Sequence, residues 1–327
     1  MPLNIQIVGA GSWGLALTRL LAHNGHRVRL WCREEDRPDE LRSTRRSPFF
    51  LRDMTLPEDV EVSREVDREC DLAVLAVPSH AMRAVATQFP FSPTTIRVSV
   101  AKGIENDTLQ CMHEVLHAVS GPCPVLALSG PSHAEEVALD LPASVVVAGE
   151  DAAACEMAQS AFVCRTFRVY TSSDVVGVEL GGALKNVIAI AAGACDGFGL
   201  GDNTKAALIT RGLAEMARLG AAMGAEPLTF AGLSGMGDLI VTCESRHSRN
   251  RLVGEKIATG MRLEEVLNSS PMVAEGVRTA KSAYALAKRH GVEMPITEQV
   301  YRVLYEGADP REAVTTLMLR DAKPERD

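Results

Sequence analysis

The glycine-rich segment near the beginning of the chain constrains the fold more than any other feature of the sequence. It reads Gly9-Ala10-Gly11-Ser12-Trp13-Gly14, which fits G-x-G-x-x-G, directly after an apolar run and directly before a helical pattern. In a strand–turn–helix unit the first glycine allows a tight turn, the second lets the backbone approach a ligand, and the third lets the helix pack closely on the strand. The segment therefore predicts a βαβ unit that holds the pyrophosphate of a dinucleotide on the free N–H groups of a helix N-terminus.

The first half of the chain continues this alternation of strand and helix. Apolar, β-branched runs typical of strands covered on both faces are expected to form strands at Leu3–Gly9, Arg27–Trp31, Leu72–Val77, Ile96–Val100, Val125–Leu128 and Ser144–Val147. Helical patterns separate them at Leu15–Asn24, His80–Phe89, Thr108–Val119 and Asp151–Phe162. With right-handed crossovers, this βαβ order predicts an α/β fold built on a doubly wound, Rossmann-type sheet.

The second half of the chain has a different character. After about Tyr170, β-branched runs become rare and patterns with a 3.6-residue period take over, as in Asn203–Ala222 and Ala274–Arg289. The polar stretch Thr171–Asp174 marks the change and would cap the helix that follows. We expect a dinucleotide-binding domain over residues 1–172 and an all-helical substrate-binding domain over residues 173–327.

Composition narrows the partners and the location of such a chain. Its 327 residues suit two domains, and its net charge of −8 argues against a nucleic acid or an anionic membrane surface as the main partner. The longest apolar stretch, Val175–Ala194, is interrupted by Glu179, Lys185 and Asn186, which argues against a membrane span. The eight cysteines show no metal-ligand spacing, and no secretory pattern is present, so we expect no metal and a cytoplasmic location.

The end of the second expected strand indicates which dinucleotide binds. It reads Trp31-Cys32-Arg33-Glu34-Glu35, and an acidic residue at this place would bind the ribose 2′-hydroxyl of NAD. The first charged residue is Arg33, whose guanidinium suits the 2′-phosphate of NADP by bidentate hydrogen bonding. Arg33 could instead be a solvated strand end. The cofactor is therefore NADP(H) or NAD(H), with NADP slightly favoured and Glu34 and Glu35 leaving NAD open.

Two further segments follow expected strands, where ligands of α/β folds bind. Lys102 comes just after the strand that ends at Val100, although a lysine there could also be an ordinary surface residue. The segment from Gly130 through Ser132 to Ala134 opens a helix and offers free N–H groups to an anion or to the nicotinamide end of the cofactor. Nothing local orients His133 within it, so we expect His133 to be a surface histidine.

The helical half contains a lysine that folding alone does not explain. Lys185 lies next to Asn186 inside an apolar helix, and a buried ammonium needs an acidic partner or a lowered pKa. Asp238 is the candidate partner. Downstream, the basic run from Arg246 to Arg251 is typical of a phosphate-binding site. A structural ion pair and a solvated basic turn remain the alternatives for these two features.

Taken together, these segments resemble the bacterial NAD(P)-dependent glycerol-3-phosphate dehydrogenases. The resemblance covers nearly the whole chain through strings in the right order, namely GAGSWG, AKGI, LSGPSHAEE, GGALKNVIAIAAGACDGFGLGDN, LITRGLAEM, GLSGMGDLIVTC, HSRNR and VAEGVRTA. It implies interconversion of dihydroxyacetone phosphate and sn-glycerol 3-phosphate, which supplies glycerophospholipid synthesis. Together with the frequency of two-fold symmetry, it also implies a homodimer.

The resemblance also implies residue roles. Lys185 would exchange the proton on the C2 oxygen while NAD(P)H delivers hydride to C2, Asp238 would orient its ammonium, and Lys102 and Arg249 would hold the substrate phosphate. The implied substrate contacts are Lys102, Gly130, Ser132, Lys185, Asn186, Asp238, Thr242, Ser248, Arg249 and Asn250. The implied cofactor contacts are Gly9, Gly11, Ser12, Trp13, Gly14, Arg33, Lys102, Ala134, Arg249, Val273 and Glu275.

Two other functions fit part of the sequence. A 6-phosphogluconate-type or hydroxyacid dehydrogenase would share the dinucleotide domain and a helical partner, but the GGALKN and HSRNR strings fit those enzymes poorly. A catalytically silent dinucleotide sensor would keep the glycine segment and would not need Lys185, Asp238 and a phosphate-binding segment.

Overall fold

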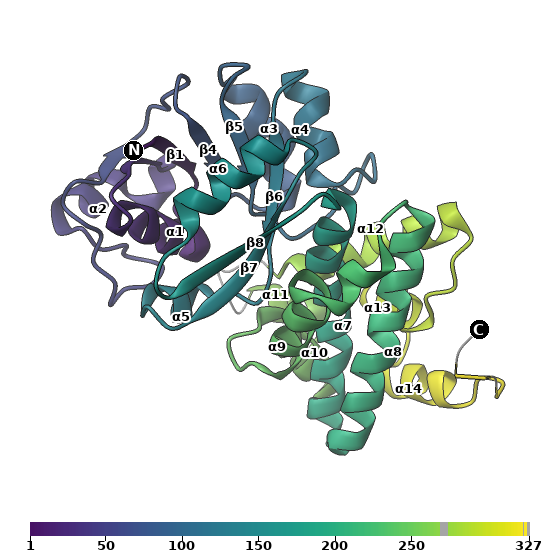
Figure 1. Cartoon of the computed structure of the whole chain (residues 1–327). Helices are drawn as coiled ribbons and strands as arrows, with labels where there is room; N and C mark the ends of the chain where they lie inside the picture. The colour runs from purple at the N-terminus through teal and green to yellow at the C-terminus, as the bar shows by residue number, and fades with distance from the viewer. Residues whose placement is uncertain (269–273, 323, 326–327) are drawn as a thin grey trace.

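A mixed sheet forms the first half of the molecule and a bundle of helices forms the second (Figure 1). The structure, a computed structural model, describes residues 1–268, 274–322, 324 and 325. Within these residues the strands are β1 (Asn4–Val8), β2 (Arg27–Trp31), β3 (Glu61–Ser63), β4 (Leu72–Leu75), β5 (Ile96–Ser99), β6 (Val125–Ser129), β7 (Ala143–Ala148) and β8 (Phe167–Ser172). Their order across the sheet is β3-β2-β1-β4-β5-β6-β7-β8.

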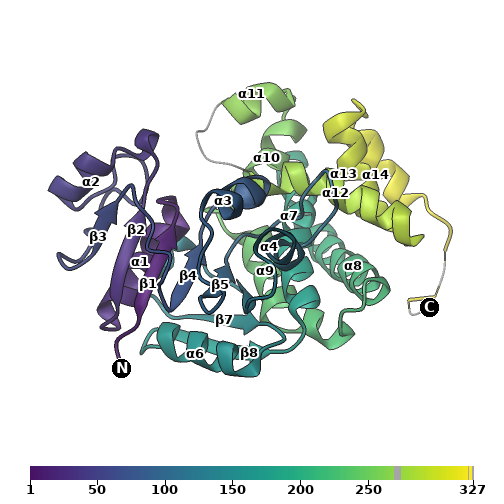
Figure 2. The same cartoon turned by 90° about the horizontal axis from the view of Figure 1, so that it is seen from above.

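Helices cover both faces of this sheet (Figure 2). They are α1 (Ser12–His23), α2 (Pro38–Thr44), α3 (Met82–Gln88), α4 (Met112–Ser120), α5 (Ala134–Ala138) and α6 (Ala152–Phe162), with short 3₁₀ turns at Glu34–Asp36 and Ser79–Ala81. On one face Leu17 of α1 packs in one cluster with Phe162 of α6, and on the other Met82 of α3 packs with Leu116 of α4. The prediction of a doubly wound α/β sheet is confirmed.

The far edge of the sheet differs from the expected arrangement. Strands β1 to β6 run parallel to one another. Strand β7 pairs with β6 in the antiparallel direction, and β8 runs parallel to β7. The only helix between β6 and β7 is α5, whose five residues rise about 7.5 Å, less than half the length of a five-residue strand at about 3.3 Å per residue. So short a helix cannot return the chain to the start of the sheet. Strands β3 and β8 were not expected from the sequence.

The helical half is built around one long helix, α7 (Val175–Phe198), which lies in the middle of the other helices (Figure 1). The others are α8 (Gly201–Ala222), α9 (Asp238–Glu244), α10 (Arg249–Ala258), α11 (Leu263–Asn268), α12 (Glu275–His290), α13 (Pro295–Tyr305) and α14 (Pro310–Met318), with short turns at Pro227–Ala231 and Leu233–Gly237. By length and composition α7 could cross a membrane, but most of its apolar window is buried inside the protein, as in a core helix.

The start of α7 is fixed as the sequence indicates. The Asp174 carboxylate accepts a hydrogen bond from the Gly177 N–H at 2.8 Å, which caps the helix. Its other oxygen accepts from the Glu226 N–H at 2.9 Å and from the Thr229 hydroxyl at 2.6 Å. One side chain therefore ties the beginning of α7 to the loop that leads toward α9.

Helices α7 and α10 cross with their backbones in direct contact. A Cβ on Gly193 of α7 would overlap the carbonyl oxygen of Arg251, and a Cβ on Gly254 of α10 would overlap the carbonyl oxygen of Ile190. Only glycine allows so close an approach at these two positions. The crossing fixes the beginning of α10 relative to the middle of α7.

A buried carboxylate joins two further helices. Glu215 of α8 is 1% exposed and accepts hydrogen bonds from the backbone N–H groups of Ile296, at 2.6 Å, and Thr297, at 3.1 Å, in the first turn of α13. Burial raises the pKa of Glu215 to about 7, even though these hydrogen bonds favour the charged form.

Candidate active site

The glycine segment has the backbone geometry that a dinucleotide requires. Gly9 has a φ of 115°, and a Cβ there would lie 2.5 Å from the carbonyl oxygen of Ala76. A Cβ on Gly14 would overlap the carbonyl oxygen of Gly9, whereas a Cβ on Gly11 would meet nothing within 4 Å. Gly9 and Gly14 are thus constrained by the fold itself, while Gly11 faces open space at the N-terminus of the twelve-residue helix α1. This cradle fits the pyrophosphate of NAD(P).

Three of the other expected cofactor residues lie in the first turns of helices. Ser12 and Trp13 begin α1, and the Trp13 indole N–H is buried without a hydrogen-bond partner among the described residues. Ala134 begins α5. Val273, also expected to contact the cofactor, lies outside the residues that the structure describes.

Arg33 follows β2 and its guanidinium is engaged with a carboxylate that the sequence did not single out. Its Nη2 and Nε donate to Asp36 at 3.0 and 3.3 Å, and the Arg33 side chain remains 61% exposed. Glu34 instead pairs with Arg64 at 2.8 Å. The signal for Asp36 was its i,i+3 spacing from Arg33, which brings the two side chains together in a single turn.

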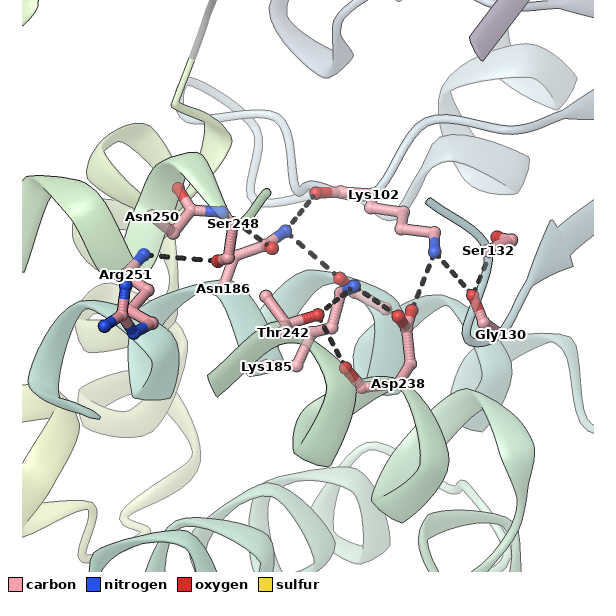
Figure 3. A network of polar contacts seen from close by, with 11 residues as sticks. Lys102, Gly130, Ser132, Lys185, Asn186, Asp238, Thr242, Ser248, Asn250 and Arg251 are labelled. Atoms are coloured by element: carbon pink, nitrogen blue, oxygen red, sulfur yellow. Dashed lines mark hydrogen bonds and ion pairs between the residues drawn. The ribbon is translucent and has the colours of Figure 1, made fainter. Parts of the chain in front are cut away.

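Lys185 lies in the middle of α7 and is held by two groups of α9. Its Nζ donates to Asp238 Oδ1 and, at 2.7 Å, to the Thr242 hydroxyl (Figure 3). All three side chains are buried, with Lys185 6% exposed and Asp238 1% exposed. Asp238 and Thr242 share one face of α9 because they are four residues apart. The pairing of Lys185 with Asp238 that the sequence indicates is therefore present.

A second lysine, from the sheet half, reaches the same carboxylate. Lys102 follows β5, and its Nζ donates to Asp238 Oδ2 at 2.7 Å and to the carbonyl oxygen of Gly130, after β6, at 2.8 Å. The Ser132 hydroxyl donates to that same carbonyl oxygen at 2.9 Å (Figure 3). Asp238 thus lies between two ammonium groups from different halves of the molecule.

Burial and the neighbouring charges shift the pKa values of Asp238 and Lys185. Burial alone would raise the pKa of Asp238, but the ammoniums of Lys102 and Lys185 outweigh it and hold that pKa below its usual range. Burial lowers the pKa of Lys185 to about 7, with Lys102 adding to the shift and Asp238 opposing it. A lysine in this condition can both give and take a proton near neutral pH.

A chain of amides connects Lys185's neighbour to the start of α10. The Asn186 side chain donates to the Lys102 carbonyl oxygen at 3.1 Å and accepts from the Asn250 side chain at 2.8 Å. Asn250 in turn accepts from the Gly276 N–H at 2.9 Å. This chain joins the loop after β5 to α7, α10 and α12.

The basic segment at the start of α10 divides its residues between structure and surface. Ser248 caps α10 by accepting from the Arg251 N–H at 3.2 Å, and Arg251 is held by Asp196 at 2.6 Å. Arg249 is exposed, and its guanidinium makes no hydrogen bond or ion pair with the part of the chain that the structure describes. A free guanidinium at a helix N-terminus suits a phosphate. We call Ser248, Arg249 and Asn250 the clamp.

Two residues near this site were missed or misjudged from the sequence. The Glu275 carboxylate accepts from the Ser79 N–H at 3.2 Å and from the Ser79 hydroxyl at 2.7 Å, so Ser79 ties the loop after β4 to α12. The expectation that His133 is a surface residue is wrong, because it is half-buried and its ring lies 5.9 Å from that of His247. Neither contact has a local signal, since both join distant parts of the sequence.

Comparisons with known proteins identify the family of this chain. Residues 4–155 match the family model described as NAD-dependent glycerol-3-phosphate dehydrogenase N-terminus, and residues 174–315 match the corresponding C-terminus model. A glycerol-3-phosphate dehydrogenase [NAD(P)+] from Geobacter sulfurreducens is 52% identical over 100% of both chains, and one from Pelotomaculum thermopropionicum is 51% identical over 97% of this chain and 93% of its own.

Solved structures give the same result. The crystal structure of a glycerol-3-phosphate dehydrogenase from Coxiella burnetii has a TM-score of 0.94 and 37% identity, and the match covers 98% of this chain and 99% of that one. The matched models cover both the sheet half and the helical half, including the glycine segment, Lys185 and the clamp. This chain belongs to the family of NAD-dependent glycerol-3-phosphate dehydrogenases.

Proposed function

We propose that this protein interconverts dihydroxyacetone phosphate and sn-glycerol 3-phosphate, with NAD(P) as the hydride carrier. The observation that carries the proposal is the position of Lys185, a buried lysine between the half that contains the glycine cradle and the clamp on α10. The names of the curated relatives, glycerol-3-phosphate dehydrogenase [NAD(P)+], support the substrate and the cofactor.

In this proposal Lys185 is the catalytic acid and base. When bound, NAD(P)H supplies the hydride that reaches C2 of the ketone, and negative charge then develops on the C2 oxygen. Lys185 Nζ donates a proton to that oxygen during reduction and accepts it back during oxidation, as its lowered pKa allows. Asp238 and Thr242 fix the direction of the ammonium, since each accepts a hydrogen bond from it.

The other site residues hold the substrate. Arg249 and the neighbouring Ser248 and Asn250 bind the phosphate, and Lys102, Gly130 and Ser132 line the opposite side of Lys185 (Figure 3). Binding the phosphate at one place leaves C2 within reach of Lys185, which lowers the barrier by orientation rather than by chemistry. A dehydrogenase for an unphosphorylated hydroxyacid would have no use for the clamp, and a silent sensor would have no use for Lys185.

Oxidation of NADPH followed by absorbance tests this function. We expect rapid oxidation with dihydroxyacetone phosphate and much slower oxidation with unphosphorylated dihydroxyacetone. Lys185→Ala should lose kcat by several orders of magnitude with a modest change of KM. Equal rates on the two ketones would contradict the clamp, and near-normal turnover of Lys185→Ala would contradict the role of Lys185.

The cofactor preference is a separate proposal. NADP is slightly favoured because Arg33 is largely exposed at the end of β2 and could bind a 2′-phosphate in place of Asp36. Arg33→Ala should therefore raise the KM for NADPH more than the KM for NADH. An equal rise of both KM values would contradict the proposed preference for NADP.

Three broader features are also proposed. We propose a dinucleotide-binding domain over residues 1–172 and a substrate-binding domain over residues 173–327, and the end of β8 at Ser172 supports this division. We propose a cytoplasmic location, which the eight free thiols support. We also propose a homodimer, which the frequency of two-fold symmetry among oligomers supports. Light scattering on the purified protein tests the dimer.

A further inference from the structure

Two histidines from opposite halves of the chain meet next to the proposed site. His133 lies between β6 and α5, and His247 lies between α9 and α10. Their ring centroids are 5.9 Å apart and their planes are inclined by 55°. This tilted arrangement and separation are typical of a packed aromatic pair.

Each histidine is the immediate neighbour of a segment assigned above to the substrate. His133 follows Ser132, whose hydroxyl bonds to the Gly130 carbonyl oxygen, and His247 precedes Ser248, which caps α10. Both segments are therefore anchored within their own half of the molecule. The ring contact connects these two segments directly.

No hydrogen bond among the described residues competes with this contact for the His133 ring. Its Nε2 is buried and has no hydrogen-bond partner there. Burial lowers the pKa of His133, and the positive charges of Lys185 and Lys102 add to the shift and outweigh nearby carboxylates. The His133 imidazole is therefore neutral at pH 7, and its contact with His247 does not bring two cations together.

We propose that the His133–His247 contact positions the segment Gly130–Ser132 against the clamp and thereby sets the KM for the phosphorylated substrate. The inference rests on the proposed function. A ligand held by both segments binds with full affinity only when their correct separation is populated, and the apparent dissociation constant rises as that population falls. Neither imidazole exchanges a proton with the substrate in this proposal, so kcat does not depend on the pair.

The test is a double-mutant cycle with steady-state kinetics on dihydroxyacetone phosphate at saturating NADPH. His133→Ala and His247→Ala should each raise KM about three- to tenfold, the range that corresponds to loss of one aromatic pair, and keep kcat within about twofold. The double alanine variant should be no worse than either single variant, because both remove the same contact. His117→Ala, at an exposed histidine of α4, is the matched control and should leave both constants unchanged.

A conservative pair separates positioning from direct contact with the substrate. The variant with His133→Phe and His247→Phe keeps two packed rings but no imidazole nitrogen, and we expect a KM near that of the wild type. A high KM in this variant, with an unchanged melting temperature, would mean that a ring nitrogen binds the substrate, which overturns the proposal. The double phenylalanine variant still tests the proposal if an alanine variant has a lower melting temperature than the wild type.

The remaining outcomes are distinguishable. Additive effects of the two alanine substitutions, or an unchanged KM in both, would overturn this inference while the wild type still reduces dihydroxyacetone phosphate. A loss of kcat without a change of KM would also overturn it. A wild-type protein that does not reduce dihydroxyacetone phosphate would overturn the proposed function and this inference together.

Discussion

Replacing Asp238 with asparagine removes the one carboxylate that opposes the lowered pKa of Lys185. The asparagine side chain would keep the shape of the aspartate and could still accept a hydrogen bond from Lys185 Nζ. The two influences that lower the Lys185 pKa, burial and the Lys102 ammonium, would both remain. An adjacent opposite charge changes a pKa by about one to three units, so we take a fall of about two units, from about 7 to about 5.

The size of the kinetic effect follows from the fraction of Lys185 that carries a proton. Ketone reduction requires that proton, so in the wild type kcat should fall as the pH rises through about 7. At pH 7.5 the protonated fraction is about 24% for a pKa of 7 and about 0.3% for a pKa of 5, a loss of roughly 75-fold. At pH 5.5 the two fractions are about 97% and 24%, so the loss shrinks to roughly fourfold.

The assay is kcat for the reduction of dihydroxyacetone phosphate by Asp238→Asn and by the wild type across this pH range. Thr242→Val is the matched control, because it removes a neutral hydrogen bond from Lys185 without changing the charge. Its loss of rate should be about the same at both pH values. If the loss in Asp238→Asn were also equal at pH 5.5 and 7.5, Asp238 would act on geometry alone and the charge argument would be refuted. Melting temperatures check that each variant is folded.

Other predictions concern the clamp, the cradle and a buried carboxylate. Arg249→Ala should raise the KM for dihydroxyacetone phosphate about tenfold or more with little change in kcat, and a lower kcat at an unchanged KM would contradict the clamp. Gly11→Ala should melt as the wild type does but lose stabilisation by NADPH, whereas Gly14→Ala should melt earlier even without cofactor, because its Cβ overlaps the Gly9 carbonyl; the reverse pattern would contradict the assigned roles. The raised pKa of Glu215 means that the folded state binds a proton more tightly than the unfolded state, so stability should fall by about 3 kcal/mol as the pH rises from about 4.5 to 7. Glu215→Gln should remove that slope in urea unfolding at pH 5 and 8, and an unchanged slope would assign it to other groups.

The parts of the fold that sequence predicts best are those set by local pattern. The glycine segment, the apolar strands and the polar cap at Asp174 each act within a few residues, and each is found where expected. The pairing of Lys185 with Asp238 was also predictable, because a buried ammonium needs an acidic partner. The antiparallel direction of β7 follows from the length of α5, whose boundaries the sequence does not define closely enough.

Contacts between distant segments account for most of the rest. Nothing near Lys102 in the sequence indicates that its ammonium reaches Asp238, and nothing near His133 indicates His247. Asp36 was overlooked although it is only three residues from Arg33, because the two preceding glutamates offered more obvious charges. The contacts of Lys102 and His133 depend on how the two halves pack together, which the pattern of one segment cannot encode.

The close crossing of α7 and α10 at two glycines sets a distance within the proposed site. Because the backbones of α7 and α10 touch at Gly193 and Gly254, the helix that carries Lys185, the proposed proton donor, is fixed relative to the first turn of α10. In the proposed function, the crossing therefore sets the distance between the backbone positions of Lys185 and Arg249, and a substrate must match that distance from its phosphate to its reacting carbon. A substrate one carbon longer would then call for a different crossing of these helices or for a shorter reach of the side chain at position 249.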